Sequence, residues 1–121
     1  MKNALNWFEI PAADIKRAAK FYGTIFDAEL KIEEATPGFK MAQLPSENGV
    51  GGAVLQGEGY APRADGTLVY LNGGDDLSAV LDRVAAAGGQ VVMPKTSIGE
   101  NGFMAYFMDT EGNRVGLHSM G

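Results

Sequence analysis

Hydrophobic positions follow a helical spacing in two segments of the chain. In "DIKRAAKFYGTIF", which starts at Asp14, apolar or aromatic side chains stand one, four, five and eight residues after the aspartate. The segment "DLSAVLDRVAAAG", which starts at Asp76, has apolar side chains at the same four offsets. Such spacing places each set on one face of an amphipathic helix. Each aspartate is the expected N-cap, because its carboxylate can accept hydrogen bonds from the first free backbone amides.

Strand-like segments surround both predicted helices in the same order. One segment precedes each helix, at residues 4–10 and 66–71. Three follow each helix, at residues 28–34, 38–44 and 51–56 in the first half and 89–94, 102–108 and 113–119 in the second. The last two of each trio are joined by Gly- and Asn-containing turns, at 48–49 and 111–113, which are typical of hairpins. The pattern therefore predicts a βαβββ unit that occurs twice.

The repeat predicts a single α+β domain over residues 1–121. The first module covers about residues 3–58, a polar linker about 59–65, and the second module about 66–121. A helix covers only one side of each small sheet, so the two modules can pair around the other side. We predict two paired βαβββ modules that form a concave, cleft-bearing sheet with the helices on the outside. Clefts of this kind are where ligands usually bind.

Composition and charge narrow the possible partners. The net charge of −5 disfavours nucleic acids and anionic membranes, which require a basic surface. The chain has no cysteine, which excludes disulfides, thiolate nucleophiles and cysteine-based zinc sites. No apolar run approaches the roughly 20 residues that cross a bilayer, and the first residues lack a signal-peptide pattern. We expect a soluble, cytoplasmic domain that binds neither nucleic acid nor membrane.

Three motifs accompany the repeat. They are the D-x-x-x-A-x-x-F-Y helix from Asp14 to Tyr22, the A-G-G at 87–89, and the D-x-x-G-N-R-V-G hairpin from Asp109 to Gly116. With these motifs the whole chain resembles the vicinal oxygen chelate superfamily, which includes glyoxalase I, the bleomycin- and fosfomycin-resistance proteins and the extradiol dioxygenases. The resemblance implies paired βαβββ modules, a homodimer and, in most members, one divalent metal in the cleft.

The resemblance also implies where metal ligands would stand. The first, usually His or Gln about seven residues before the capping aspartate, is Trp7 here. Its counterpart in the second module is Val69, or Thr67 if the register shifts by two residues. The last, usually Glu in the return strand of the final hairpin, is Gly116. A catalytic divalent metal needs about three imidazole or carboxylate ligands, so we expect no metal and no other cofactor.

Two residues are candidates for acid–base chemistry. Glu9 shares a strand face with Trp7, and a carboxyl group beside an indole would be partly desolvated, which raises its pKa and suits a general acid or base. His118, the only histidine, alternates in phase with Gly116 and titrates near neutral pH. The alternatives are an ion-paired or rim glutamate and an ordinary surface histidine.

The predicted ligand-binding residues are Trp7, Met41, Gln43, Thr67, Val69, Met104, Tyr106 and Gly116, although the sequence leaves open which strand faces line the cleft. Trp7 could stack on a flat ligand or fill the cleft. We predict a glyoxalase/bleomycin-resistance-like protein that binds a small organic molecule in a metal-free cleft, with or without metal-independent turnover. The alternatives are a metal-dependent lyase, isomerase or dioxygenase of the same superfamily, and a non-catalytic interaction module with a filled cleft.

Overall fold

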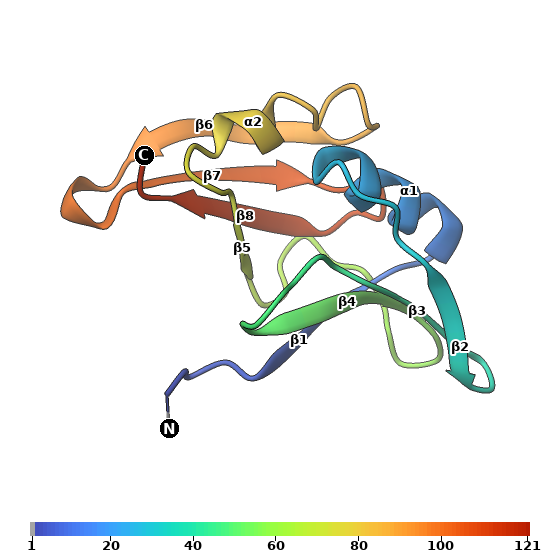
Figure 1. The fold of residues 1–121 in the computed structure, drawn as a ribbon. Helices are drawn as coiled ribbons and strands as arrows, with labels where there is room; N and C mark the ends of the chain where they lie inside the picture. The colour runs from blue at the N-terminus through green and yellow to red at the C-terminus, as the bar shows by residue number, and fades with distance from the viewer. Residues whose placement is uncertain (1) are drawn as a thin grey trace.

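The computed structural model describes residues 2–121 as two four-stranded sheets, each with a helix (Figure 1). The first module contains β1 (Trp7–Pro11), α1 (Ile15–Ile25), β2 (Ile32–Thr36), β3 (Phe39–Gln43) and β4 (Gly51–Gln56). The second contains β5 (Tyr70–Asn72), α2 (Ser78–Leu81), β6 (Gln90–Ser97), the short 3-10 helix η1 (Gly99–Asn101), β7 (Phe103–Met108) and β8 (Arg114–Ser119). The predicted α+β class and the repeated βαβββ order are confirmed.

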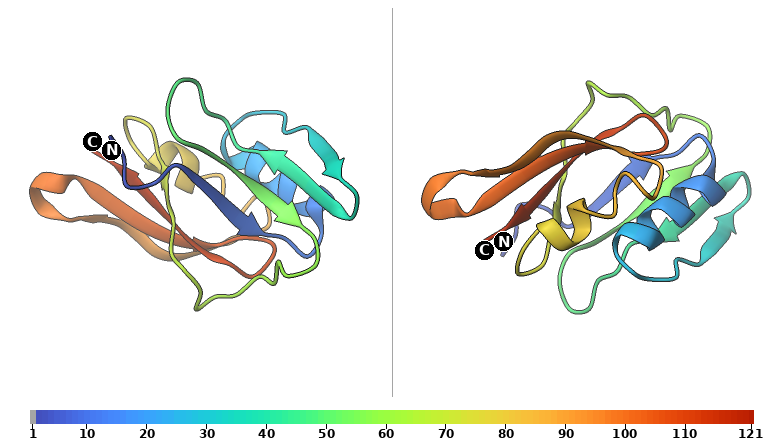
Figure 2. Two further views of the ribbon diagram at one scale, coloured as in Figure 1. Left: turned by 90° about the horizontal axis from the view of Figure 1, so that it is seen from below. Right: turned by 90° about the horizontal axis from the view of Figure 1, so that it is seen from above.

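Both sheets have the same topology. Their strand orders are β1-β4-β3-β2 and β5-β8-β7-β6. In each, the strand before the helix pairs in parallel with the last strand of the module, and the remaining pairs are antiparallel. Figure 2 shows both helices in front of the strands from above and behind them from below. Each sheet therefore has one face toward the helices and an opposite face, which we call its open face.

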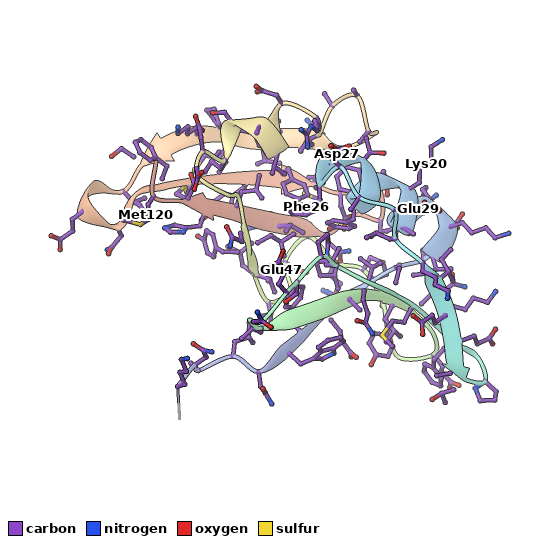
Figure 3. The ribbon with its side chains drawn as sticks, in the orientation of Figure 1. Lys20, Phe26, Asp27, Glu29, Glu47 and Met120 are labelled. Atoms are coloured by element: carbon purple, nitrogen blue, oxygen red, sulfur yellow. The ribbon has the colours of Figure 1, made fainter. Side chains whose placement is uncertain are left out.

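Helix α1 forms where the sequence predicts it and joins the two modules. The Asp14 carboxylate accepts hydrogen bonds from the backbone amides of Lys16 (3.1 Å) and Arg17 (3.2 Å), as expected for an N-cap. The ring of Phe21 lies 5.7 Å from the ring of Phe107 on β7, so α1 packs against the second sheet as well as its own. Phe26, which follows α1, lies between the two sheets and packs against this shared core (Figure 3).

Helix α2 is shorter than predicted. The prediction that Asp76 is its N-cap is wrong, because the N-cap is Leu77; the Asp76 carboxylate still accepts a hydrogen bond from the Ser78 amide at 2.9 Å, just ahead of the helix. After Leu81 the hydrogen bonds become those of tight turns: the Val84 amide donates to the Leu81 carbonyl three residues earlier. The predicted apolar positions are nevertheless all buried, so the hydrophobic pattern was right although the regular helix ends early. No helix within residues 2–121 is long and apolar enough to cross a membrane.

The A-G-G motif follows these turns and is explained by close packing. Gly88 has a positive φ of 104°, which L side chains rarely adopt. A Cβ on Gly89 would lie 2.7 Å from Cε1 of Phe21. The motif therefore lets the second module approach α1 closely, which is a structural role.

Candidate binding site on the open faces

Gly116 lies in the middle of β8, between Tyr70 on β5 and Tyr106 on β7. A Cβ at this position would lie 2.6 Å from Cδ1 of the Tyr70 ring. The Tyr70 ring thus occupies the space into which a side chain from position 116 would project. A glycine inside a strand often marks such a close approach. The Tyr70 and Tyr106 hydroxyl oxygens are 2.9 Å apart, which is hydrogen-bond distance.

The residue paired with Gly116 is Tyr70, which the sequence analysis did not name. Val69 and Thr67, the predicted counterparts of Trp7, lie just before it in the chain. Val69 packs against the core and accepts a hydrogen bond from the Gly116 amide at 2.8 Å through its carbonyl, whereas Thr67 is exposed ahead of β5. Tyr70 was missed because only the pairing of β5 with β8 shows which residue lies opposite Gly116.

The open face of the second sheet carries four of the predicted residues. Met104 pairs with His118, and Tyr106 pairs with Gly116. Strand alternation places Arg114, which the sequence reading missed, on the same face. Its guanidinium carbon lies 5.4 Å from the centre of the Tyr106 ring.

His118 faces a groove on this sheet. The groove has a volume of about 1240 Å³ and is lined by residues that include Tyr70, Asn101, Met104 and His118. Met120, at the chain end beyond β8, also lines it (Figure 3). The His118 Nε2 atom lies 2.7 Å from the Asn101 carbonyl oxygen. A carbonyl can only accept, so Nε2 carries the proton and Nδ1 of the neutral ring is an acceptor.

The open face of the first sheet carries Trp7 and Glu9 on β1 together with Met41 and Gln43 on β3. The pairing of both strands with β4 puts these four side chains on the face opposite α1. Trp7 is 42% exposed, so its indole does not fill a hole in the core. Trp7 is therefore part of the exposed surface of this face.

Glu9 is the acceptor in a small cluster on this face. Its carboxylate accepts hydrogen bonds from the Tyr60 hydroxyl (2.6 Å) and the Trp7 Nε1 (3.2 Å). The hydrogen bond to Glu9 raises the pKa of Tyr60, with smaller contributions from burial and the carboxylate charge. The predicted desolvation of Glu9 is wrong, because the residue is exposed. Tyr60 was missed because it lies in the predicted linker.

A second hollow lies between the modules. This pocket has a volume of about 420 Å³, and its lining includes Glu9, Thr67, Val69 and Arg114. The structure therefore brings Glu9 together with Thr67 and Val69, but His118 lines the other hollow. Arg114 lines the pocket between the modules, and its guanidinium group also lies over the ring of Tyr106.

The D-x-x-G-N hairpin has a structural role beside these hollows. Asp109 is buried, and its carboxylate accepts hydrogen bonds from the Tyr22 hydroxyl (2.7 Å), the Glu111 amide (2.8 Å), and both the backbone amide and side-chain Nδ2 of Asn113 (2.9 Å each). Asn113 also donates to the Pro11 carbonyl through Nδ2, at 2.7 Å. The motif therefore holds the last hairpin against α1 and the end of β1.

Burial and charge alter the titration of two groups in this network. Burial raises the pKa of the Tyr22 hydroxyl well above its ordinary value of 10.0, and the negative charge of Asp109 adds to this shift. Burial alone would raise the pKa of Glu111, but hydrogen bonds from the Arg17 side chain and the Asp14 amide lower it overall. Both shifts come from contacts between the modules, so they concern stability and not ligand chemistry.

Comparison with known families agrees with this fold. The model of the Glyoxalase/Bleomycin resistance protein/Dioxygenase superfamily matches residues 4–117. The chain belongs to this superfamily. It is 33% identical over 118 residues to the candidate glyoxylase CFP32 of Mycobacterium bovis, covering 93% of the chain but only 44% of that relative. It is 31% identical over 117 residues to a glyoxylase-like domain-containing protein of Didymella fabae, covering 90% of the chain and 88% of the relative.

Solved structures of the superfamily share the architecture. A glyoxylase/bleomycin resistance protein/dioxygenase domain from Frankia superposes with a TM-score of 0.73 at 13% identity, with full coverage of both chains. The antibiotic binding protein TnmS3 from Streptomyces gives 0.62 at 23% identity, covering 98% of this chain and 97% of that one. A glyoxalase I variant from Zea mays gives 0.69 at 20% identity, covering 95% and 46%. At these identities the likeness shows the fold alone.

The residues at the expected ligand positions do not fit a divalent metal. The Trp7 indole N–H is a hydrogen-bond donor and donates to Glu9. Gly116 has no side chain, and the Tyr70 ring fills the space beside it. Within residues 2–121, no group of three or more His, Cys, Asp or Glu side chains is arranged to hold a metal ion. This donor set lacks the imidazole and carboxylate ligands that such a site requires.

Proposed function

We propose that the chain binds a small organic molecule on its open faces without the help of a metal. The observation that carries this proposal is the Tyr70 ring, which lies against Gly116, the position where the family resemblance implies a metal-binding carboxylate. The adjoining hollows, of about 1240 and 420 Å³, offer enough volume for a small ligand. The antibiotic binding activity in the name of TnmS3 is consistent with such a role on this fold.

The chain is also proposed to form a homodimer. Trp7 and Tyr70 expose 42% and 47% of their surface, and both lie on open faces. Three consecutive apolar residues of the edge strand β6, Val91 to Met93, are exposed as well. Uncovered apolar edge strands are frequent contact surfaces. Light scattering after size-exclusion chromatography tests this: twice the chain mass of 12.8 kDa is expected, and a monomer at 100 µM contradicts it.

Metal-independent turnover is the second candidate function, and the orientation of His118 supports it. With its Nε2 proton donated to Asn101, the neutral ring presents Nδ1 as a base on a residue that lines the groove. If a ligand found by screening is converted, replacement of His118 by Gln should abolish the conversion while leaving ligand binding within about twofold. Equal conversion by both proteins would remove His118 from the chemistry.

The decisive experiment combines metal analysis with a ligand screen. Protein purified without a metal-binding tag is incubated with Zn, Ni, Mn and Fe(II), freed of unbound ions and analysed for its elements. Less than about a tenth of an equivalent is expected from the ligand set, and near one equivalent per chain would contradict the proposal. A thermal-shift screen then identifies ligands, since a ligand that binds only the folded state raises the apparent stability. The variant Lys20→Gln, on exposed α1 surface (Figure 3), should show the same ligand shifts as the natural chain.

A further inference from the structure

Arg114 stands out among the cationic side chains beside the open faces. The salt bridges within residues 2–121 involve Arg17, Arg63 and Lys95, and Arg114 forms none. Glu9, which lines the same pocket, already accepts hydrogen bonds from its aromatic neighbours and makes no ion pair with Arg114. The guanidinium group of Arg114 therefore retains its five N–H donors for a partner from outside the chain.

Two tyrosine hydroxyls extend this set of donors. The hydroxyls of Tyr70 and Tyr106 share one hydrogen bond of 2.9 Å, which uses one of their two protons. The other proton is free to be donated to a ligand. The hydrogen bond with Tyr106 raises the pKa of Tyr70, while the charge of Arg114 opposes this shift. The guanidinium carbon of Arg114 lies 5.4 Å from the centre of the Tyr106 ring, which places its positive charge beside one tyrosine of the pair.

We propose that Arg114, together with the hydroxyl pair of Tyr70 and Tyr106, binds the carboxylate group of a small aromatic ligand. This inference rests on the proposed function and adds the chemical class of the ligand. The guanidinium fork matches the two oxygens of a carboxylate, and the free hydroxyl proton provides another charge-assisted hydrogen bond. The two tyrosine rings, 6.0 Å apart, offer surfaces on which the aromatic part of the ligand can pack.

The overall charge of the chain does not oppose this assignment. The net charge is −5, but charges in physiological salt are screened over about 8 Å. At the site itself the guanidinium carbon of Arg114 lies 5.4 Å from the centre of the Tyr106 ring, and Arg114 forms no salt bridge within residues 2–121. Short-range hydrogen bonds from this charged group therefore favour an anionic ligand.

The test uses three aromatic probes of similar size whose polar groups are negative, neutral and positive: benzoate, benzyl alcohol and benzylammonium. Each is titrated into the full chain, and binding is followed by NMR of the backbone amides, the tyrosine rings and the arginine Nε–H groups. Benzoate should shift the resonances of Tyr70, Tyr106 and Arg114. It should bind about tenfold more tightly than benzyl alcohol, the effect of one added charge-assisted hydrogen bond.

Variants separate the role of Arg114 from the general effect of charge. Arg114→Gln should remove the preference for benzoate, and Arg114→Lys, which keeps the charge but not the fork, should retain only part of it. Arg63→Gln is the matched control, because Arg63 lines the same pocket but is paired with Asp65 at 2.9 Å. It makes the same charge change and should alter benzoate binding by less than about twofold. The amide spectrum of each variant reports whether the fold is retained.

The possible outcomes distinguish this inference from the proposed function. Equal binding of benzoate and benzyl alcohol, or undiminished benzoate binding by Arg114→Gln, would overturn the carboxylate site and leave small-molecule binding intact. Tighter binding of benzylammonium would also overturn it and would direct attention to Glu9. If none of the probes shifts open-face resonances, the carboxylate site is refuted, and a thermal-shift screen without hits would refute the proposed function as well.

Discussion

Replacement of Tyr22 by Phe tests the connection between α1 and the last hairpin. The Tyr22 side chain is fully buried, and its hydroxyl donates to the Asp109 carboxylate at 2.7 Å. The substitution keeps the ring and its packing against Phe107 but removes one of four hydrogen bonds to a buried charge. Hydrogen bonds to charged groups contribute about 1.5–3 kcal/mol, so the free energy of unfolding should fall by that amount. For a chain of this length the melting temperature should fall by about 5–15 °C.

Urea unfolding followed by circular dichroism measures this difference directly. Tyr60→Phe is the matched control, because it removes the same atom from an exposed hydrogen bond to Glu9, and it should change the stability by less than about 0.5 kcal/mol. A Tyr22→Phe protein as stable as the natural chain would refute the reasoning. An equal loss in both variants would show that burial of the hydroxyl is not what matters.

Three further predictions concern the same contacts and the open face. The pKa of Tyr22 is raised in the folded state, so its contribution to stability is complete below pH 10 and is lost as the pH rises through the folded pKa. Between pH 9 and 11, the free energy of unfolding should therefore decline less steeply for Tyr22→Phe than for the natural chain. Glu111 should change stability in the opposite pH direction, because its pKa is lowered in the folded state. Its contribution is present above the ordinary glutamate pKa of 4.5 and is lost as the pH falls through the folded pKa. The free energy of unfolding should therefore fall less steeply with acid for Glu111→Gln than for the natural chain. Gly116→Ala should lower the free energy of unfolding in urea by about 1–3 kcal/mol, because its Cβ would contact the Tyr70 ring. The loss should be smaller when Tyr70 is also replaced by Ala. An unchanged loss would show that the Tyr70 ring is not the obstacle.

The features that the sequence predicts well depend on local periodicity. The offsets after Asp14 and Asp76 place apolar residues on one helix face, and all eight positions are buried in the structure. Such periodicity reflects the geometry of a single element, so it can be recognised without knowing what packs against it. The order of the strands follows in the same way, because turns and apolar runs mark each strand.

The features that the sequence does not predict depend on contacts between distant segments. The pairing of Tyr70 with Gly116 joins residues 46 positions apart, and no local pattern specifies that register. Tyr60 reaches Glu9 from a segment that reads as a polar linker. The early end of α2 reflects tight turns that bring Gly89 against Phe21 on the other module. Each of these depends on how the two modules pack together.

Two residues of the hairpin motif that marks the superfamily, Asp109 and Asn113, serve the fold. Asp109 and Asn113 bind Tyr22 and the end of β1, and so hold together the two modules of the domain. None of these contacts involves the open faces, so the residues on those faces can differ while Asp109 and Asn113 are retained. On the open face, the Tyr70 ring occupies the space beside Gly116, and Arg114 forms no salt bridge within residues 2–121. The function of this chain must therefore be sought in the open-face residues, including Arg114 of the hairpin motif, and not in Asp109 and Asn113.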